Sequence, residues 1–196
     1  KDICFASDMQ TLTETENAQP CLYLTDLSIA KILVDNGIKP DAVAGFSLGE
    51  IPALAFAKVF SEEDGFKFVC IRGEAMKKAN ENHPGGMVAA LKLPPETVEK
   101  VASEFKQIYP VNYNCPGQVS CAGAFDELDG FVEAIKKEGG RAVKLAVSGA
   151  FHSPYMEEAS LVLKNALESI PVSAAQIPVY SDRSGEVYPE NEEGIK

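Results

Sequence analysis

The segment Gly-Phe-Ser-Leu-Gly at residues 45–49 constrains the fold more than any other part of this chain, because it places a serine between two glycines. The short apolar run 42–44 precedes it and the apolar run 51–57 follows it. Strand, sharp turn and helix form the context in which the serine of a G-x-S-x-G pattern becomes a nucleophile. The glycines make room for the turn, and N–H groups at the start of the helix point toward an oxyanion formed there. The pattern predicts an α/β fold with Ser47 at the end of a strand.

The composition excludes several classes of protein. With 196 residues, of which 45% are hydrophobic, the chain can bury the core of one domain or of a domain with an insertion. A net charge of −11 argues against binding to nucleic acid. No apolar run approaches the roughly 20 residues that span a bilayer, and the first residues do not resemble a signal peptide. We therefore expect a cytoplasmic protein without a membrane partner.

The chain contains five cysteines without C-x-x-C spacing, and three of them have apolar neighbours in the sequence. This pattern predicts reduced, buried thiols rather than a disulfide framework or a zinc site.

Hydrophobic periodicity predicts the elements around the elbow. No clear period is present through residue 17, whereas a helix is predicted from residue 20 to the stop at Gly37. Ser61, followed by three acidic residues, is typical of a helix N-cap and predicts a helix to about residue 80. A helix over residues 156–170 and a strand over 177–180 complete this part.

The middle of the chain has a different pattern. Its predicted elements are strand 87–93, helix 95–105, strand 109–113, strand 118–122, helix 125–137 and strand 142–147. The order β-α-β-β-α-β is that of ferredoxin-like domains. We therefore expect an α/β core formed by residues 1–83 and 148–196, with a ferredoxin-like subdomain at 84–147 inserted into it.

A nucleophilic serine needs a base, and the chain has only two histidines. His152 follows the last strand of the predicted insertion, and loops just beyond strands form the sites of α/β sheets. A residue at a helix N-terminus without a chemical role is the alternative for His152, and the residues alone leave both open. His83 lies in a polar turn before Pro84, which predicts a solvated loop histidine.

Arg72 is the third candidate for the site. Phe68 and Met76 lie four residues before and after it, which puts the guanidinium on a partly apolar face of a helix. A surface arginine paired with a glutamate is one interpretation. The other is an arginine that binds a substrate carboxylate, because its planar fork matches that group and an unpaired buried charge is costly.

Four segments in this order resemble the malonyl-CoA:acyl carrier protein transacylases, the acyltransferases of fatty acid and polyketide synthesis. They comprise residues 18–20 with the elbow, 71–76, 110–118 and 147–153. The resemblance implies an α/β-hydrolase-like core with an inserted ferredoxin-like subdomain. It also implies that Ser47 is the acylated nucleophile, His152 its base, Arg72 the partner of the malonyl carboxylate and the Leu48 N–H an oxyanion donor.

The same resemblance implies a ping-pong reaction that supplies extender units for fatty acid synthesis. Malonyl would pass from malonyl-CoA to Ser47 and then to the phosphopantetheine thiol of acyl carrier protein, without a metal or a bound cofactor. Phe151, directly before the histidine, resembles the residue that accompanies malonyl selection in polyketide acyltransferases. It would fill the space that a 2-methyl group needs.

The chain also departs from the family pattern. Phe46 stands where members most often have histidine, and Pro52 is unusual in the helix after the elbow. The Gly-Gln-Gly segment of the family's opening strand and the closing segment that orients the histidine do not occur in residues 1–196. We expect little transfer from a chain confined to these residues, because an oxyanion donor is worth about 10²–10³ in rate.

Two rival functions remain open. A serine hydrolase or thioesterase would have the same elbow, although Arg72 and the predicted insertion favour transfer. A non-catalytic module that docks carrier protein is the second rival, and the complete set of Ser47, His152 and Arg72 argues against it.

Overall fold

The computed structural model describes residues 2–147 and 149–195, and its contacts group the chain into two compact units. The first unit comprises residues 1–75 and 161–196, and the second comprises residues 76–160. Ser148, which is the predicted domain boundary, lies outside the described residues. None of the described helices is long and apolar enough to cross a membrane.

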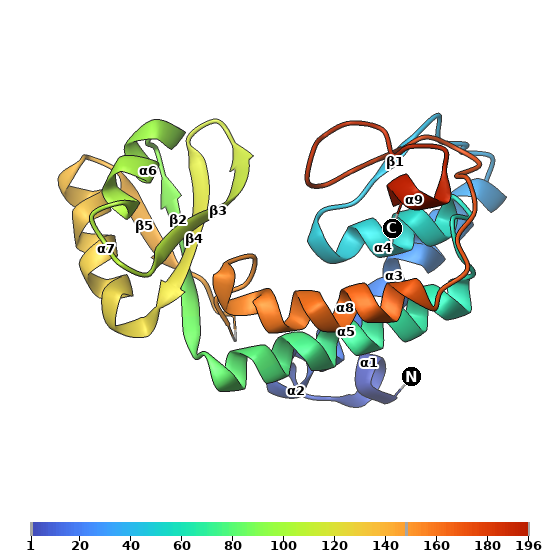
Figure 1. Ribbon diagram of the computed structural model, residues 1–196, viewed down its shortest axis with the longest axis horizontal. Helices are drawn as coiled ribbons and strands as arrows, with labels where there is room; N and C mark the ends of the chain where they lie inside the picture. Colours follow the sequence, from blue (N-terminus) through green and yellow to red (C-terminus); the bar gives the residue numbers. More distant parts are fainter. Residues whose placement is uncertain (1, 148, 196) are drawn as a thin grey trace. The chain divides into compact units, whose positions relative to one another are not determined.

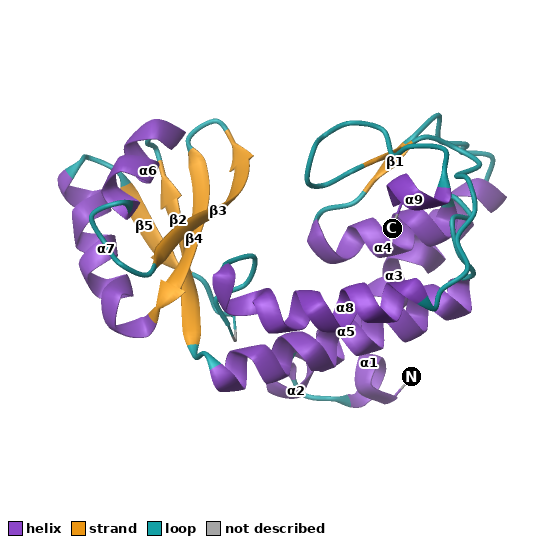
Figure 2. Cartoon of the chain, viewed as in Figure 1, coloured by secondary structure: helices purple, strands orange, loops and turns teal. Residues whose placement is uncertain are grey.

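The first unit is mainly helical (Figures 1 and 2). Helices α1 (Asp2–Ala6) and α2 (Met9–Thr13) lead into the long helix α3 (Thr15–Asp35). The short helix α4 (Glu50–Phe56) follows the elbow, and α5 (Glu62–Asn82) begins in this unit and extends into the second. Helix α8 (Glu157–Glu168) ends in the first unit, and α9 (Glu192–Ile195) lies near the end of the chain.

A small parallel sheet positions the elbow. Strand β1 (Val43–Ala44) pairs with β6 (Val179–Tyr180), with Val43 opposite Val179 and Ala44 opposite Tyr180. Because parallel strands run in the same direction, the segments that follow β1 and β6 leave the sheet at the same edge. Ser47 and Asp182 are in these two segments.

The core of the first unit holds α3, α4 and α5 together. Tyr23 of α3 is 1% exposed, and its hydroxyl donates to the Glu62 carbonyl at 2.8 Å. The start of α5 is fixed by Ser61, whose Oγ accepts the Asp64 N–H at 3.0 Å, as expected of an N-cap. The remaining buried members of this cluster come mostly from α3, α4 and the turns around them: Leu27, Leu48, Ile51, Ala53, Leu54, Ala55, Ala57, Val59, Phe60, Val69, Ile170, Val179 and Ile195.

The second unit contains a four-stranded antiparallel sheet in the order β3-β4-β2-β5. Its elements follow the chain as β2 (Gly85–Leu91), α6 (Pro95–Ala102), β3 (Ile108–Cys115), β4 (Gln118–Ala124), α7 (Phe125–Lys137) and β5 (Arg141–Lys144). Val88 and Ala90 of β2 pack with α6 and α7, whereas Met87 packs with Ala150 in a separate cluster. Successive residues of β2 therefore point to opposite faces of the sheet and pack in different clusters.

Most elements lie where the sequence predicts them, and helix 125–137 has the predicted bounds. The prediction was wrong at the N-terminus, where α3 begins at Thr15 and carries Pro20 inside it. The prediction of buried thiols was also largely wrong, since only Cys121 is buried. All five cysteines are free, and the Cys4 and Cys21 sulfurs lie 2.9 Å apart.

Candidate active site

Ser47 lies in the sharp turn that the sequence predicts. Strand β1 ends at Ala44, a 3-10 turn covers Ser47–Gly49, and α4 starts at Glu50. A Cβ atom on Gly45 would come within 2.0 Å of the Gly49 carbonyl group, so only glycine fits there. A Cβ on Gly49 would meet no atom within 4 Å, and its φ of −59° suits any residue. The first glycine of the motif therefore closes the turn, whereas the second is not required by local packing.

The backbone of Ser47 has the left-handed conformation, with φ of 52°. Among the described non-glycine residues, this region is also occupied by His152 at 61°, Lys58 and Lys92. Such conformations are unfavourable for residues with a Cβ and concentrate at functional sites. Both residues expected to carry the chemistry, Ser47 and His152, thus belong to this small group.

The side chain of Arg72, in α5, contacts Ser47. One guanidinium nitrogen donates to Ser47 Oγ at 3.1 Å, and another donates to Gln19 Oε1 at 2.5 Å. Burial lowers the pKa of Arg72, while the charges of Glu50 and Asp182 oppose that shift. None of the ion pairs between described residues involves Arg72. The guanidinium is therefore half-buried, close to the serine and without a carboxylate in direct contact.

Gln19 contacts Arg72 and helps to hold it in this position, a role that the sequence analysis did not assign to this residue. It is 5% exposed, and its Nε2 donates to Thr15 Oγ1 at 2.8 Å while its Oε1 accepts from Arg72. The helices that carry the two residues approach closely at Gly73, where a Cβ would lie 2.8 Å from Glu16 Cα. The place of Gln19 in the segment 18–20, which resembles the family, was the available signal.

Two acidic residues at the elbow were also missed. Asp182 Oδ2 accepts the Ser47 N–H at 2.9 Å, and the Asp182 N–H donates to Glu50 Oε1 at 2.8 Å. Asp182 follows a predicted strand, so the rule that sites form beyond the ends of parallel strands could have identified it. In the described part of the chain, no cluster of three histidine, cysteine, aspartate or glutamate side chains is arranged to hold a metal ion.

His152 lies in the second unit, in an exposed turn between β5 and α8. The next residue, Ser153, is buried and stabilises this turn: its hydroxyl donates to the Ala150 carbonyl at 2.6 Å and accepts the Tyr155 N–H at 3.2 Å. The loop position of His152 agrees with the sequence prediction. His83 is exposed, with Nε2 3.7 Å from Glu158 Oε1, as expected for a solvated histidine.

Phe151 and Leu48, the other two predicted site residues, lie in different units. Phe151 is half-buried and packs on the cluster of Met87, Ala122 and Ala150. Leu48 is 9% exposed, and its side chain belongs to the core of the first unit. Its N–H is in the first turn after the elbow, where backbone donors lack acceptors within the helix.

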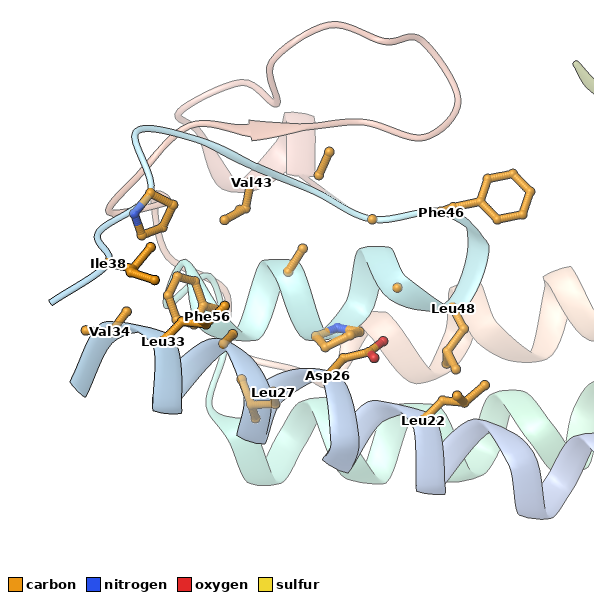
Figure 3. Close-up of a pocket in the computed structure, with 17 residues that line it drawn as sticks. Leu22, Asp26, Leu27, Leu33, Val34, Ile38, Val43, Phe46, Leu48 and Phe56 are labelled. Atoms are coloured by element: carbon orange, nitrogen blue, oxygen red, sulfur yellow. The ribbon is translucent and has the colours of Figure 1, made fainter. Parts of the chain in front are cut away.

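An apolar cavity of about 560 Å³ lies beside the elbow in the first unit. Figure 3 shows it between α3, which contributes Leu22, Leu27 and Val34, and the segment from Val43 to Phe56. Asp26 is the only charged residue among those that line it, and Ser47 and Arg72 are not among them. The cavity is therefore adjacent to the turn that carries Ser47 but is not lined by Ser47 itself.

Comparison with known proteins agrees with these observations. The family model described as acyl transferase domain matches residues 1–193. A malonyl CoA-acyl carrier protein transacylase of Bacillus subtilis (strain 168) is 37% identical over 193 residues, which are 96% of this chain and 61% of the relative.

Solved structures of malonyl transacylases are also similar to this chain. The malonyl CoA-acyl carrier protein transacylase of Clostridium perfringens matches with a TM-score of 0.91 and 35% identity, over 97% of this chain and 61% of that one. A malonyl-transacylase in complex with a type II polyketide acyl-carrier protein matches with a TM-score of 0.90 and 31% identity, over 97% and 63% of the two chains. This chain thus spans less than two thirds of the length of these relatives.

Proposed function

The chain belongs to the acyl transferase domain family, and on that premise we propose that it transfers malonyl from malonyl-CoA to acyl carrier protein. Ser47 carries the acyl group between the two half-reactions. The phosphopantetheine thiol of the carrier protein is the second acceptor, as in a ping-pong mechanism. The relatives named as malonyl CoA-acyl carrier protein transacylases, and the relative solved with an acyl-carrier protein, support this choice of substrates.

The observation that carries the proposal is the contact between Arg72 and Ser47 Oγ at 3.1 Å. When malonyl is esterified to Ser47, a single methylene separates its carboxylate from the ester carbonyl. A guanidinium that already touches Oγ is therefore within reach of that carboxylate. Arginine binds carboxylates through two parallel hydrogen bonds, and the absence of an acid from direct contact with Arg72 in the described structure suits this role.

The steps follow from the roles of the other residues. His152 takes the Ser47 proton as the hydroxyl attacks the thioester carbonyl, and the CoA thiol leaves with a proton from the same imidazole. The Leu48 N–H stabilises the tetrahedral oxyanion. The carrier-protein thiol then attacks the ester, and Ser47 recovers its proton. Each half-reaction exchanges a thioester and an ester, so no metal or bound cofactor is needed.

The arrangement of strands and helices in both units supports the same function. We propose that residues 84–147 form a ferredoxin-like subdomain, which the β-α-β-β-α-β order and the strand order β3-β4-β2-β5 support. The parallel pair β1–β6 with the elbow at its end fits an α/β-hydrolase-like core formed by residues 1–83 and 148–196. We infer that this fold favours transfer over simple hydrolysis, because two solved transacylases match the chain with TM-scores of 0.91 and 0.90.

Transfer and hydrolysis are separated by following the fate of labelled malonyl. The protein, expressed from its complete reading frame, is mixed with malonyl-CoA labelled in the acyl group, with and without holo acyl carrier protein. We expect label on the carrier-protein thiol, and little free malonate when the carrier is omitted. Rapid release of malonate regardless of carrier would establish the hydrolase instead. A carrier that binds without accepting label, on a protein that stays unlabelled, would establish the docking module.

A further inference from the structure

Asp182 occupies a position at the elbow that the proposed reaction steps do not use. It lies two residues beyond β6, the strand that pairs with β1 in parallel. Ser47 lies three residues beyond β1, so the topology brings the two residues to the same edge of the sheet. There the Asp182 carboxylate accepts the backbone N–H of the nucleophile at 2.9 Å.

Asp182 is itself held by a second acid. Glu50 Oε1 accepts the Asp182 N–H and the Tyr188 hydroxyl, each at 2.8 Å. The Tyr188 phenol is protonated at neutral pH and donates to Glu50, and burial together with this hydrogen bond raises its pKa to about 12. The chain after β6 is thereby tied to the first turn of α4, and the carboxylate of Asp182 is directed at Ser47.

We propose that Asp182 is the positioning residue of the nucleophile, and that its negative charge limits how strongly Arg72 binds a substrate carboxylate. The first half follows from the strain at Ser47, whose φ of 52° is unfavourable without compensation. A charged acceptor on the Ser47 N–H stabilises that conformation more than a neutral hydrogen bond would. It therefore keeps Oγ in place beside Arg72.

The proposed effect of Asp182 on carboxylate binding follows from the charges around Arg72. This part of the inference rests on the proposed function. Asp182 and Arg72 contact the same residue, at the Ser47 N–H (2.9 Å) and at Ser47 Oγ (3.1 Å), so the carboxylate lies near the guanidinium without forming an ion pair with it. Burial lowers the pKa of Arg72, and the charges of Glu50 and Asp182 accordingly oppose this effect. A malonyl carboxylate that binds Arg72 enters the field of these two acids, and like charges disfavour one another. Acetyl carries no charge and does not meet this repulsion. Asp182 therefore lowers the preference for malonyl relative to acetyl.

Two substitutions separate the hydrogen bond from the charge. Asp182→Asn keeps a side-chain oxygen for the Ser47 N–H and removes the charge, whereas Asp182→Ala removes both. Glu186→Gln is the matched control, because Glu186 is an exposed acid in the same hairpin. Each protein, expressed from its complete reading frame, is acylated with malonyl-CoA or acetyl-CoA in rapid-quench experiments. The kcat and KM of Ser47 acylation are measured separately, and circular dichroism checks that each variant is folded.

We expect Asp182→Ala to lower kcat for both acyl groups by about 10–100-fold, as small displacements of a nucleophile do. Asp182→Asn should restore most of kcat and lower KM for malonyl-CoA alone, which raises the malonyl-to-acetyl preference by about twofold to fivefold. Glu186→Gln should match the wild type.

Wild-type kcat in folded Asp182→Ala would overturn the positioning role. An unchanged malonyl-to-acetyl preference in Asp182→Asn would overturn the electrostatic role, and so would the same gain in Glu186→Gln. A wild-type protein that is not acylated at all would contradict the proposed function itself, which distinguishes that failure from the others.

Discussion

At the residue scale, Arg72 contacts Ser47 Oγ, and we propose that it binds the carboxylate of the acyl group. We predict that Arg72→Ala lowers malonyl transfer by about 10²–10³, because the substrate carboxylate is then desolvated without a partner. Acetyl transfer should change much less. A competition assay with malonyl-CoA and acetyl-CoA measures both rates in one reaction. Arg183→Ala, at an exposed arginine, is the control and should leave the ratio unchanged. An equal loss of transfer rate for malonyl and acetyl would show that Arg72 supports the structure and does not bind the malonyl carboxylate.

Phe151 is predicted to exclude a branched acyl chain. It is half-buried against Met87 and Ala150, so its ring has a defined place before His152. Phe151→Ser should admit methylmalonyl, with a gain of about 10-fold or somewhat more, because one methyl group in a pocket is worth about 1–3 kcal/mol. The measurement is acylation by methylmalonyl-CoA relative to malonyl-CoA. If the ratio does not move, Phe151 does not contact the 2-position of the acyl group.

At the element scale, the two glycines of the elbow should behave differently. A Cβ at Gly45 would overlap the Gly49 carbonyl group, so Gly45→Ala is expected to distort the turn and abolish acylation of Ser47. Gly49→Ala should be tolerated, because its φ is −59° and no atom lies within 4 Å of the new Cβ. Thermal unfolding and acylation are compared for the pair. Similar behaviour of the two variants would contradict this geometry of the turn.

The elements that the sequence predicted best have strong local signals. Helix α7 has a clear apolar face and acids in its first turn, and Ser61 caps α5 as its position indicated. The N-terminal helices were missed because their apolar residues are exposed and show no period, as at Phe5 and Met9. A local signal for α2 was nevertheless present, because Asp8 caps it by accepting the Thr11 N–H at 2.7 Å.

In the candidate site, too, residues with a local sequence signal could be identified, whereas contacts between distant parts of the chain could not. A motif and an unusual helix face mark Ser47 and Arg72 as candidates, and the structure brings the two side chains into contact, while their roles stay predictions. The contacts of Arg72 with Gln19, and of Ser47 with Asp182, join positions 53 and 135 residues apart. They arise from the parallel pairing of β1 with β6 and from the close approach at Gly73, which are properties of the fold rather than of a local sequence.

At the scale of the whole molecule, two tyrosines with raised pKa values should make the free energy of unfolding depend on pH in the alkaline range. Burial raises the pKa of Tyr23 and of Tyr188 to about 12, from about 10 in an unfolded chain. A raised pKa in the folded state means that the stabilisation is complete below about pH 10 and is lost as the pH rises toward 12. Denaturant unfolding over this range should therefore show falling stability in the wild type.

The decline should be smaller in Tyr188→Phe, which removes one of these ionisations. Tyr180→Phe, at an exposed tyrosine, is the matched control and should retain the wild-type slope. A slope that is identical in all three proteins would show that Tyr188 ionises equally in the folded and unfolded states.

The central claim is that Ser47 carries malonyl as a covalent intermediate, and mass spectrometry tests it most directly. The protein from its complete reading frame is mixed with malonyl-CoA, quenched in acid and digested. We predict a gain of one malonyl group on the peptide that contains Ser47, its loss when holo acyl carrier protein is added before quenching, and no gain in Ser47→Ala. A malonyl group that persists in Ser47→Ala, or that lies on another residue of the wild type, would contradict the account.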